Sequence, residues 1–415
     1  MATKKNQRMN FKLLIIVLNI FPFLVNAQGF QVNLQGQIQQ GMGGAGTALM
    51  QDASSLFFNP GGSCFVNENS VNLGLTPTIA KGAFIDASTN QISRTNSPIS
   101  TPFAAYALFQ PKDSSNLKFG IAVYTPFGST VQWEENWTGR FALTRLELRA
   151  IFFQPTISYK LTKNLGIGAG FVYADGKVNL QKDIPLNNAN GTYAHAELSG
   201  KANGIGFNAG IYYKPLEKLS IGLTYRSQVN MEVNDGDATF TVPTSVATNF
   251  PSGKFKSKLP LPNVTTLGLA YKINTKLDLA LDINYVGWKA YDTLAFDYST
   301  NTEKLLDTKS ARMYKNTFAL RGGAQYKITE QLITRLGLAY GITPVQNGYV
   351  TPETPDANRI NYTVGIGYQF GKHLRFDASC LFTQLERSDT NIETNLSGTF
   401  RTNVIAPGIS ITYKF

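Results

Sequence analysis

The stretch LDLALDINY, residues 277–285, has an apolar side chain at every second position. Successive side chains of a β-strand point to opposite faces, so one face of this segment is aliphatic or aromatic. The other face carries Asp278, Ala280, Asp282 and Asn284. The same alternation returns in residues 165–173, 362–370 and 405–415. The chain therefore predicts a series of strands, each with one apolar face and one small or polar face.

The length of these segments and their charges indicate which face is buried. Strands of a soluble sandwich run about 5–6 residues, whereas strands that cross a bilayer need about 9–11, and several segments here are that long. Charged residues also lie deep within the strands on the polar face: Asp278, Asp282, Arg321, Arg335, Arg375 and Asp377. We interpret them as the lining of a wet lumen, in which the aspartates pair with arginines such as Arg321 or Arg335. Lipid allows no open sheet edge, so the sequence predicts an all-β fold: a transmembrane antiparallel β-barrel.

The connections predict the number of strands. A short unit of an aromatic, a few polar residues and a leucine recurs at 159–165, 213–219, 271–277, 326–332 and 368–374, with a looser copy at 109–117. Long polar connections lie between these units. Short periplasmic turns that alternate with long outer loops are typical of outer-membrane barrels. The pattern predicts about fourteen strands with both chain ends on the periplasmic side, and alternation that continues to Phe415 suits the final strand.

Composition agrees with a membrane barrel. Hydrophobic residues make up 43% of the chain and aromatic residues 12%, while charged residues are 16%, below the roughly 25% usual in soluble domains. The net charge of +11 comes without a basic cluster interleaved with aromatics, so we expect no nucleic-acid partner. Contact with anionic outer-membrane lipids is a sufficient explanation. Two cysteines, Cys64 and Cys380, make no disulfide framework.

The N-terminal region divides into two parts. Residues 1–27 have a basic start, an apolar core and small residues at the cleavage positions, which predicts a signal peptide and export to the outer membrane. Residues 28–65 are rich in glycine, show no lasting alternation, and contain a turn at Asn59, Pro60 and Gly61. Either a disordered arm or a compact plug fits this composition. Because a barrel follows in residues 66–415, we interpret 28–65 as a plug, the hatch, folded into the lumen.

The chain resembles the FadL/TodX family of outer-membrane transporters of hydrophobic compounds over nearly the whole mature sequence. Gly29-Phe30-Gln31 is similar to the family's N-terminal Gly-Phe-Gln, and Asn59-Pro60-Gly61 to its Asn-Pro-Ala hatch motif, with a glycine that loosens the bend. Residues 223–227 and 355–359 match further family blocks. The resemblance implies a fourteen-strand barrel that holds a long-chain fatty acid or a similar molecule, with Phe30 against the ligand. Aromatic-hydrocarbon uptake by the same scaffold is the alternative.

The resemblance also implies outer and inner ligand contacts. Trp133, Trp137 and Phe141 are candidates for an outer apolar groove, and an interfacial aromatic girdle explains them equally well. A carboxylate head group needs a basic partner. The family's arginine position in the fifth strand aligns with Leu180 here. Lys177, Lys182 or the Lys309/Arg312/Lys315 group could replace that arginine, unless these are ordinary solvated charges.

The third strand contains a defect at Pro126, Phe127 and Gly128. Proline cannot donate a ladder hydrogen bond, and Gly128 permits a bulge, so the barrel wall can open here. The family resemblance implies the same, because its third strand is kinked and a glycine aligns with Gly128. A simple strand end at Pro126 is the alternative. If the gap exists, ligand can leave sideways into the membrane after the hatch rearranges.

Other functional classes fit the sequence less well. His195 and His373 are the only histidines, and the predicted topology places them at opposite ends of the barrel, where they cannot serve one catalytic site. A passive structural or adhesive barrel needs no hatch. We expect a monomer that is not an enzyme, with no cofactor, no metal, and a hydrophobic small molecule as its ligand.

Overall fold

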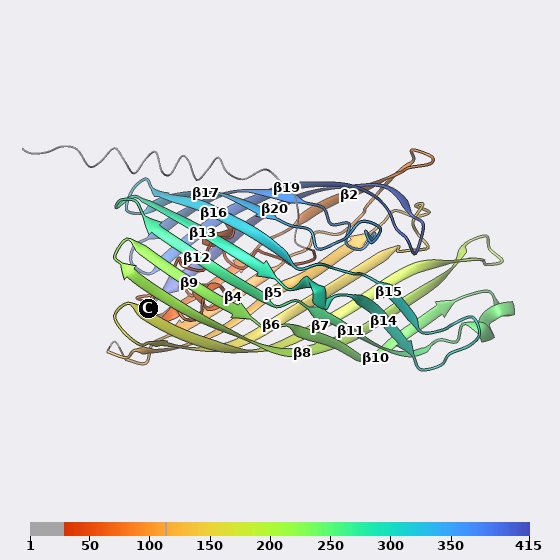
Figure 1. The fold of residues 1–415 in the computed structure, drawn as a ribbon, viewed down its shortest axis with the longest axis horizontal. Coiled ribbons are helices and arrows are strands. Elements are labelled where there is room, and N and C mark those ends of the chain that lie inside the picture. The colour runs from red at the N-terminus through yellow and green to blue at the C-terminus, as the bar shows by residue number, and fades with distance from the viewer. Residues whose placement is uncertain (1–28, 113) are drawn as a thin grey trace, which may run out of the picture.

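The computed structural model describes residues 29–112 and 114–415, and these form a closed antiparallel barrel (Figure 1). Within these residues, twenty strand segments make fourteen spanning strands, because six of the spanning strands are interrupted. The barrel closes where the first segment pairs with the last, from Ser70 opposite Lys414 to Leu75 opposite Ile409. The predicted fold class is confirmed. The predicted signal peptide, residues 1–27, lies outside the described residues.

Eight spanning strands are continuous: β5 (Leu117–Gln132), β6 (Arg145–Lys160), β7 (Leu165–Asn187), β8 (Tyr193–Leu216), β17 (Leu332–Gly341), β18 (Arg359–Phe370), β19 (Leu374–Thr390) and β20 (Ser397–Lys414). The interrupted ones are β1 (Ser70–Leu75) with β2 (Ile79–Asp86), β3 (Ile92–Arg94) with β4 (Phe103–Phe109), β9 (Leu219–Arg226) with β10 (Val229–Thr241), β11 (Gly253–Leu261) with β12 (Val264–Lys272), β13 (Leu277–Val286) with β14 (Thr293–Tyr298), and β15 (Thr308–Ala311) with β16 (Thr317–Lys327). Short helical turns are α2 (Gln37–Gln40), α3 (Ser55–Phe58), η1 (Ser63–Phe65), η2 (Thr244–Asn249) and η3 (Trp288–Ala290).

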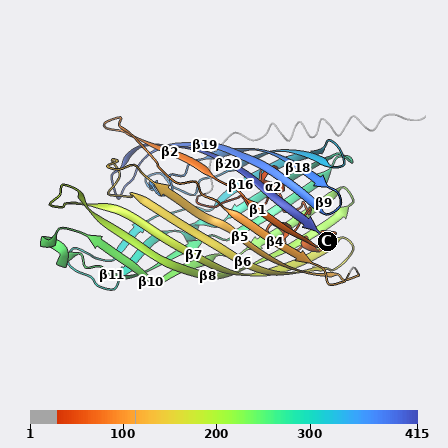
Figure 2. The same ribbon diagram turned by 180° about the vertical axis from the view of Figure 1, so that it is seen from behind.

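The predicted turns lie together at one end of the barrel. Tight connections link β4 to β5, β6 to β7, β8 to β9, β12 to β13, β16 to β17 and β18 to β19, each at a predicted position. The C-terminus lies at this end, and Figure 2 shows β7, β8, β10 and β11 reaching far toward the other. The two ends therefore correspond to the predicted periplasmic and outer sides.

The outward face of the barrel is apolar. Leu281 and Ile283 on β13 are 39% and 45% exposed, and similar side chains cover the neighbouring strands. An apolar surface this extensive would aggregate in water but suits lipid. Aromatic rings such as Tyr285 and Phe318, whose centroids are 5.3 Å apart, edge this band as in other membrane barrels. No helix among the described residues has the length and apolarity to cross a membrane.

The inward charges contact the hatch segment, defined here as residues 29–65, rather than water. Asp282 is buried and accepts hydrogen bonds from the backbone N–H groups of Gly46 (2.9 Å) and Thr47 (3.0 Å). Arg335 pairs with Asp377 at 3.0 Å, and both side chains are fully buried. The expectation of a wet lumen is therefore wrong at this level of the barrel. Hatch backbone fills the space, and its N–H groups bond Asp282, which was expected to pair with an arginine.

Candidate ligand-binding site

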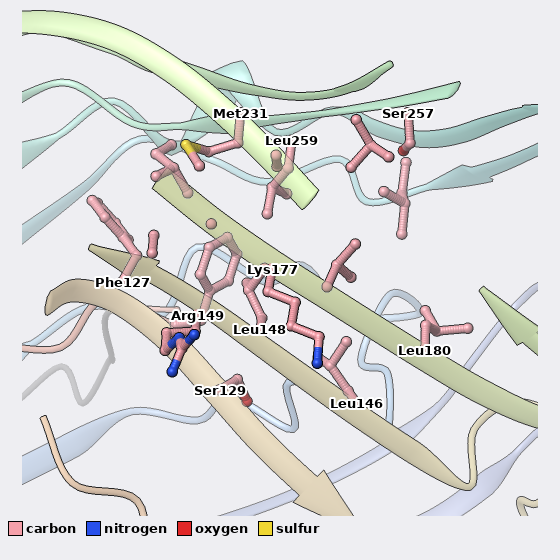
Figure 3. Close-up of a pocket in the computed structure, with 18 of the residues that line it drawn as sticks. Phe127, Ser129, Leu146, Leu148, Arg149, Lys177, Leu180, Met231, Ser257 and Leu259 are labelled. Carbon is pink, nitrogen blue, oxygen red and sulfur yellow. The ribbon is translucent and has the colours of Figure 1, made fainter. Parts of the chain in front are cut away.

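An apolar cavity lies above the hatch, inside the outer half of the barrel (Figure 3). About 850 Å³ of space lies between its lining atoms, a figure that includes the open mouth. Strands β5, β6, β7, β10, β11 and β14 supply most of its wall. The large apolar residues among its lining are Phe30, Phe127, Leu146, Leu148, Val178, Leu180, Met231, Val233, Leu259, Leu261, Tyr291, Leu294 and Phe296.

The inward side chains change character along the same strands, and this change creates the cavity. At hatch level, β7 places Gly166 and Gly168 inward, and a Cβ there would meet hatch backbone oxygens at 2.4 Å and 2.3 Å. Farther out, Val178 and Leu180 occupy the equivalent inward positions. Small residues admit the hatch backbone, and large apolar ones line the empty space beyond it. Sequence reasoning missed this signal, although inward positions that switch from glycine to leucine or valine along one strand are visible in the sequence.

Phe30 forms the floor of the cavity. Its ring is 8% exposed and contacts Trp288, Tyr291 and Phe127 edge-on, with centroids 4.8, 5.7 and 6.2 Å away. Such edge-to-face packing orients aromatic rings beyond simple burial. The ring thus touches both the cavity and the third spanning strand.

The N-terminal segment pairs with β5 at the predicted defect. The register of β5 against β6 shifts between Tyr124 and Phe127, so the strand contains a bulge and does not end at Pro126. Pairing of β5 with β4 stops at Tyr124. The Val32 N–H instead donates to the Pro126 carbonyl at 2.8 Å, and Gln31 lies opposite Phe127 in an antiparallel bridge. Hatch backbone therefore occupies hydrogen-bonding positions that β4 leaves empty.

Asp356 holds the first described residue of the chain. Its carboxylate accepts hydrogen bonds from the Gly29 N–H and the Thr343 hydroxyl, both at 2.8 Å. Burial raises the pKa of the Asp356 carboxyl above its usual range, while the Arg359 charge and these hydrogen bonds oppose the rise. The family block at 355–359 thus positions the tip of the hatch segment.

The candidate basic residues have different surroundings. Arg312 is buried and pairs with Glu353 at 2.7 Å, at the edge of the cavity that Glu353 and Tyr291 line. Lys177 borders the cavity, but it lies opposite Arg149 on the outward face of β7 and is exposed. In Figure 3 the charged ends of Lys177 and Arg149 lie on the side away from Met231 and Leu259. Arg312 is therefore already neutralised, and the Lys177 ammonium is directed away from the cavity.

The candidate outer aromatics do not line this cavity. Trp133 and Trp137 stack at 4.2 Å, are 5% and 1% exposed, and pack with Phe84 and Phe400. Phe141 is 37% exposed and contacts Tyr193 at 5.1 Å. Trp133 and Trp137 belong to the same buried core as Phe30, but not to the cavity lining.

The hatch motif packs against the barrel wall. Asn59 is fully buried, and its side-chain amide donates to the carbonyls of Thr47 (2.9 Å) and Ile211 (3.0 Å) while accepting from the Gly61 N–H (3.0 Å). A Cβ on Gly61 would lie 2.4 Å from the Gly210 carbonyl oxygen. Glycine at this position thus permits a close approach to β8. Pro60 lies between them and approaches Gly168 through its carbonyl.

The remaining candidate reactive groups are dispersed. His195 contacts Asp183 at 3.0 Å near the outer end, and His373 bonds the Lys414 carbonyl oxygen at the turn end. Cys64 and Cys380 are both free. Among the described residues, no group of three or more His, Cys, Asp or Glu side chains could hold a metal ion.

Comparison with known proteins agrees with this architecture. A model of the family "Outer membrane protein transport protein (OMPP1/FadL/TodX)" matches residues 21–415. A putative outer membrane protein of Neisseria meningitidis is 26% identical over 450 residues, covering 94% of this chain and 95% of that protein. A long-chain fatty acid transport protein of Escherichia coli is 20% identical over 396 residues, covering 85% and 86%.

Two solved structures share the fold. A Pseudomonas aeruginosa FadL homologue superposes with a TM-score of 0.80 at 19% identity, covering 94% of this chain and all of that one. The Pseudomonas putida toluene transporter TodX gives a TM-score of 0.73 at 18% identity, covering 94% and 99%. From its family match and its barrel, this chain is an outer-membrane protein that belongs to the OMPP1/FadL/TodX family of transporters of hydrophobic compounds.

Proposed function

We propose that this protein carries long-chain fatty acids or similar hydrophobic molecules through its apolar cavity and releases them sideways into the outer membrane. The observation that supports the route is the bridge between Gln31 and Phe127 at the register shift of β5. Phe30, next in the chain, is the cavity floor. Movement of one short segment away from β5 would thus open the floor and the wall together.

A sideways exit also suits the ligand. Passage through the aqueous periplasm exposes the hydrocarbon chain to water at about 0.8 kcal/mol per CH₂ group, whereas passage into lipid does not. Hatch hydrogen bonds to many strands oppose release straight through the barrel. These include bonds from the side-chain amide of Gln40 to the Ala406 carbonyl and from the Gly43 N–H to the Thr363 hydroxyl, both 2.9 Å long.

Neutral aromatic hydrocarbons are a second candidate class. The support for this alternative is the Arg312–Glu353 pair, in which the guanidinium at the cavity edge is already neutralised. A fatty acid would have to compete with Glu353 for Arg312, whereas a hydrocarbon would not. Relatives named for fatty acid and for toluene transport occur among the similar proteins, so both ligand types are used in the tests.

The lateral route is tested with Gly128→Trp. Gly128 lies opposite Arg149 on the outward face, and a Cβ there meets only the Leu148 carbonyl oxygen at 3.2 Å, so the new ring can stand across the exit. We expect uptake of radiolabelled palmitate and toluene to fall at least about tenfold in cells without another such transporter, while palmitate binding to purified protein is unchanged.

Ile121→Trp is the matched control, because Ile121 is a lipid-facing residue of the same strand and is 50% exposed. It should keep full uptake. If Gly128→Trp also transports normally, the lateral route is rejected and ligand must pass the hatch into the periplasm.

A further inference from the structure

Three cations lie side by side on the outward face of the barrel, just beyond its apolar band on the side away from the tight turns. Arg149 on β6 is opposite Lys177 on β7, and Lys177 is opposite Lys201 on β8. All three are exposed. Neighbouring strands are about 4.8 Å apart, so the row, defined as Arg149, Lys177 and Lys201, spans about 10 Å. In the described part of the chain, none of the three has an ion pair or a side-chain hydrogen bond.

The neighbouring acids compensate the row only in part. Asp175 lies one outward position along β7, and Glu147 lies one outward position along β6 but already pairs with Arg145 at 3.2 Å. Like charges directly opposite one another destabilise a sheet. An unpaired row of this kind therefore favours binding of a multiply charged anion from outside the chain.

An apolar wall lies below the row. Phe153, Tyr173 and Ile205 occupy the same three strands in register, four residues nearer the turn end, and are 40%, 43% and 67% exposed. Four residues correspond to about 13 Å along a strand, or roughly 10 Å along the membrane normal for a strand tilted about 40°. The wall thus faces acyl chains while the cations lie at head-group height.

From this arrangement we propose that the row binds the phosphorylated diglucosamine head group of lipid A in the outer leaflet. The row lies on the side of the apolar wall that faces away from the tight turns, which places it in that leaflet. Two phosphates on one rigid sugar scaffold match several cations spread over about 10 Å better than a single phosphodiester does, and charge-assisted contacts to phosphate are strong. Arg149 and Lys177 also border the cavity, and Arg149 lies opposite Gly128, but head-group binding on the outward face needs no transport of ligand and is measured separately from it.

The test is lipid binding by the full-length protein in detergent, measured by native mass spectrometry. The probes are bisphosphorylated lipid A, its dephosphorylated form, and phosphatidylglycerol. The variant Arg149→Gln/Lys177→Gln/Lys201→Gln should bind bisphosphorylated lipid A about 100-fold more weakly, from roughly fivefold for each cation near an anionic head group. The wild-type protein should bind the dephosphorylated form with similar weakness.

Lys254→Gln/Lys256→Gln/Lys258→Gln is the charge-matched control. These exposed residues lie on β11, and Lys254 and Lys258 already pair with Asp237 (2.7 Å) and Glu232 (3.2 Å). This control should retain wild-type binding. Equal binding by the row variant and the wild type overturns the proposal. Equal affinity of the wild type for bisphosphorylated and dephosphorylated lipid A also overturns it. Equal affinity for phosphatidylglycerol overturns it in favour of a phospholipid site. The single variant Lys201→Gln should show the intermediate, fivefold effect should the triple variant fail to fold.

Discussion

At the scale of single residues, the ion pair between Arg312 and Glu353 decides how the cavity treats charge. Both side chains are nearly buried, at 6% and 12% exposed. The pair keeps its end of the cavity neutral, and truncating one member leaves the other as an uncompensated charge. A ligand carboxylate that binds Arg312 must therefore replace Glu353.

Replacing Glu353 with glutamine should therefore change ligand preference. Glu353→Gln frees the guanidinium, so we expect palmitate to bind about tenfold more tightly, since a charge-assisted bond is stronger than a neutral one. Methyl palmitate, which has no charge, should bind as before and serves as the control. Isothermal titration in detergent measures both. Equal changes for the acid and the ester would show that Arg312 does not meet the head group.

Gly61 is a second residue at which a small change should affect the molecule, here the packing of the hatch on β8. Gly61→Ala places a methyl group 2.4 Å from backbone oxygen of β8, which cannot rotate away. Overpacking of this kind costs about 1–3 kcal/mol, so the thermal unfolding midpoint in detergent should fall. The control is Gly322→Ala, because a Cβ there has no neighbour nearer than 3.6 Å. Equal midpoints for both variants would contradict the close packing of the hatch on β8.

At the scale of elements, the bulged strand β5 and the N-terminal segment act as one unit. At the bulge, β4 no longer pairs with β5, and hatch residues 31 and 32 bond the β5 backbone there instead. An edge strand in lipid needs all its hydrogen bonds satisfied. Under the proposed lateral route, the wall would open where residues 31 and 32 leave β5.

A disulfide should lock that unit shut. Gln31 and Phe127 are directly opposite in an antiparallel bridge, a geometry that brings Cα atoms within disulfide reach. We expect Gln31→Cys/Phe127→Cys, made in a background where Cys64 and Cys380 are serine, to stop palmitate uptake when oxidised and to restore it with reductant. The serine background alone is the control. Uptake that is the same in both redox states would show that the segment stays on β5 during transport.

At the scale of the whole molecule, the hatch turns a wide barrel into a closed one. Its backbone N–H groups bond Asp282 of β13 and Thr363 of β18, and the Gln40 side-chain amide bonds the Ala406 carbonyl of β20. Contacts with strands far apart in sequence hold the hatch across the lumen. A barrel of fourteen strands without such a filling would leave an aqueous path.

Deleting residues 29–61 should open that path. We expect the single-channel conductance in planar bilayers to rise from a closed baseline to a porin-like value, because the buried hatch-binding groups become wetted. Heat-dependent mobility on gels checks that the shortened chain still forms a barrel, and the full-length protein is the control. Conductance equal to that of the full-length protein would mean that residues 29–61 do not seal the lumen.

The sequence by itself determined the barrel. Alternation with period two assigns each side chain of a strand to lipid or lumen, and lipid forces closure, so strand number and turn positions followed without tertiary information. Lys177 is an even number of residues from Phe171 and Tyr173 on β7, so the same alternation also assigns its side chain to the outward face. The prediction that Lys177 contacts the ligand did not take this into account. Pro126 and Gly128 likewise marked the bulge.

Only the tertiary structure decided what each inward group contacts. Asp282 meets hatch N–H groups that are 235 and 236 residues away, and Arg312 meets Glu353 across two strands. Trp133 and Trp137 turned out to be a buried stack for the same reason. Alternation gives the face of a strand but carries no information about which distant segment packs against it, because that depends on how barrel and hatch close around one another.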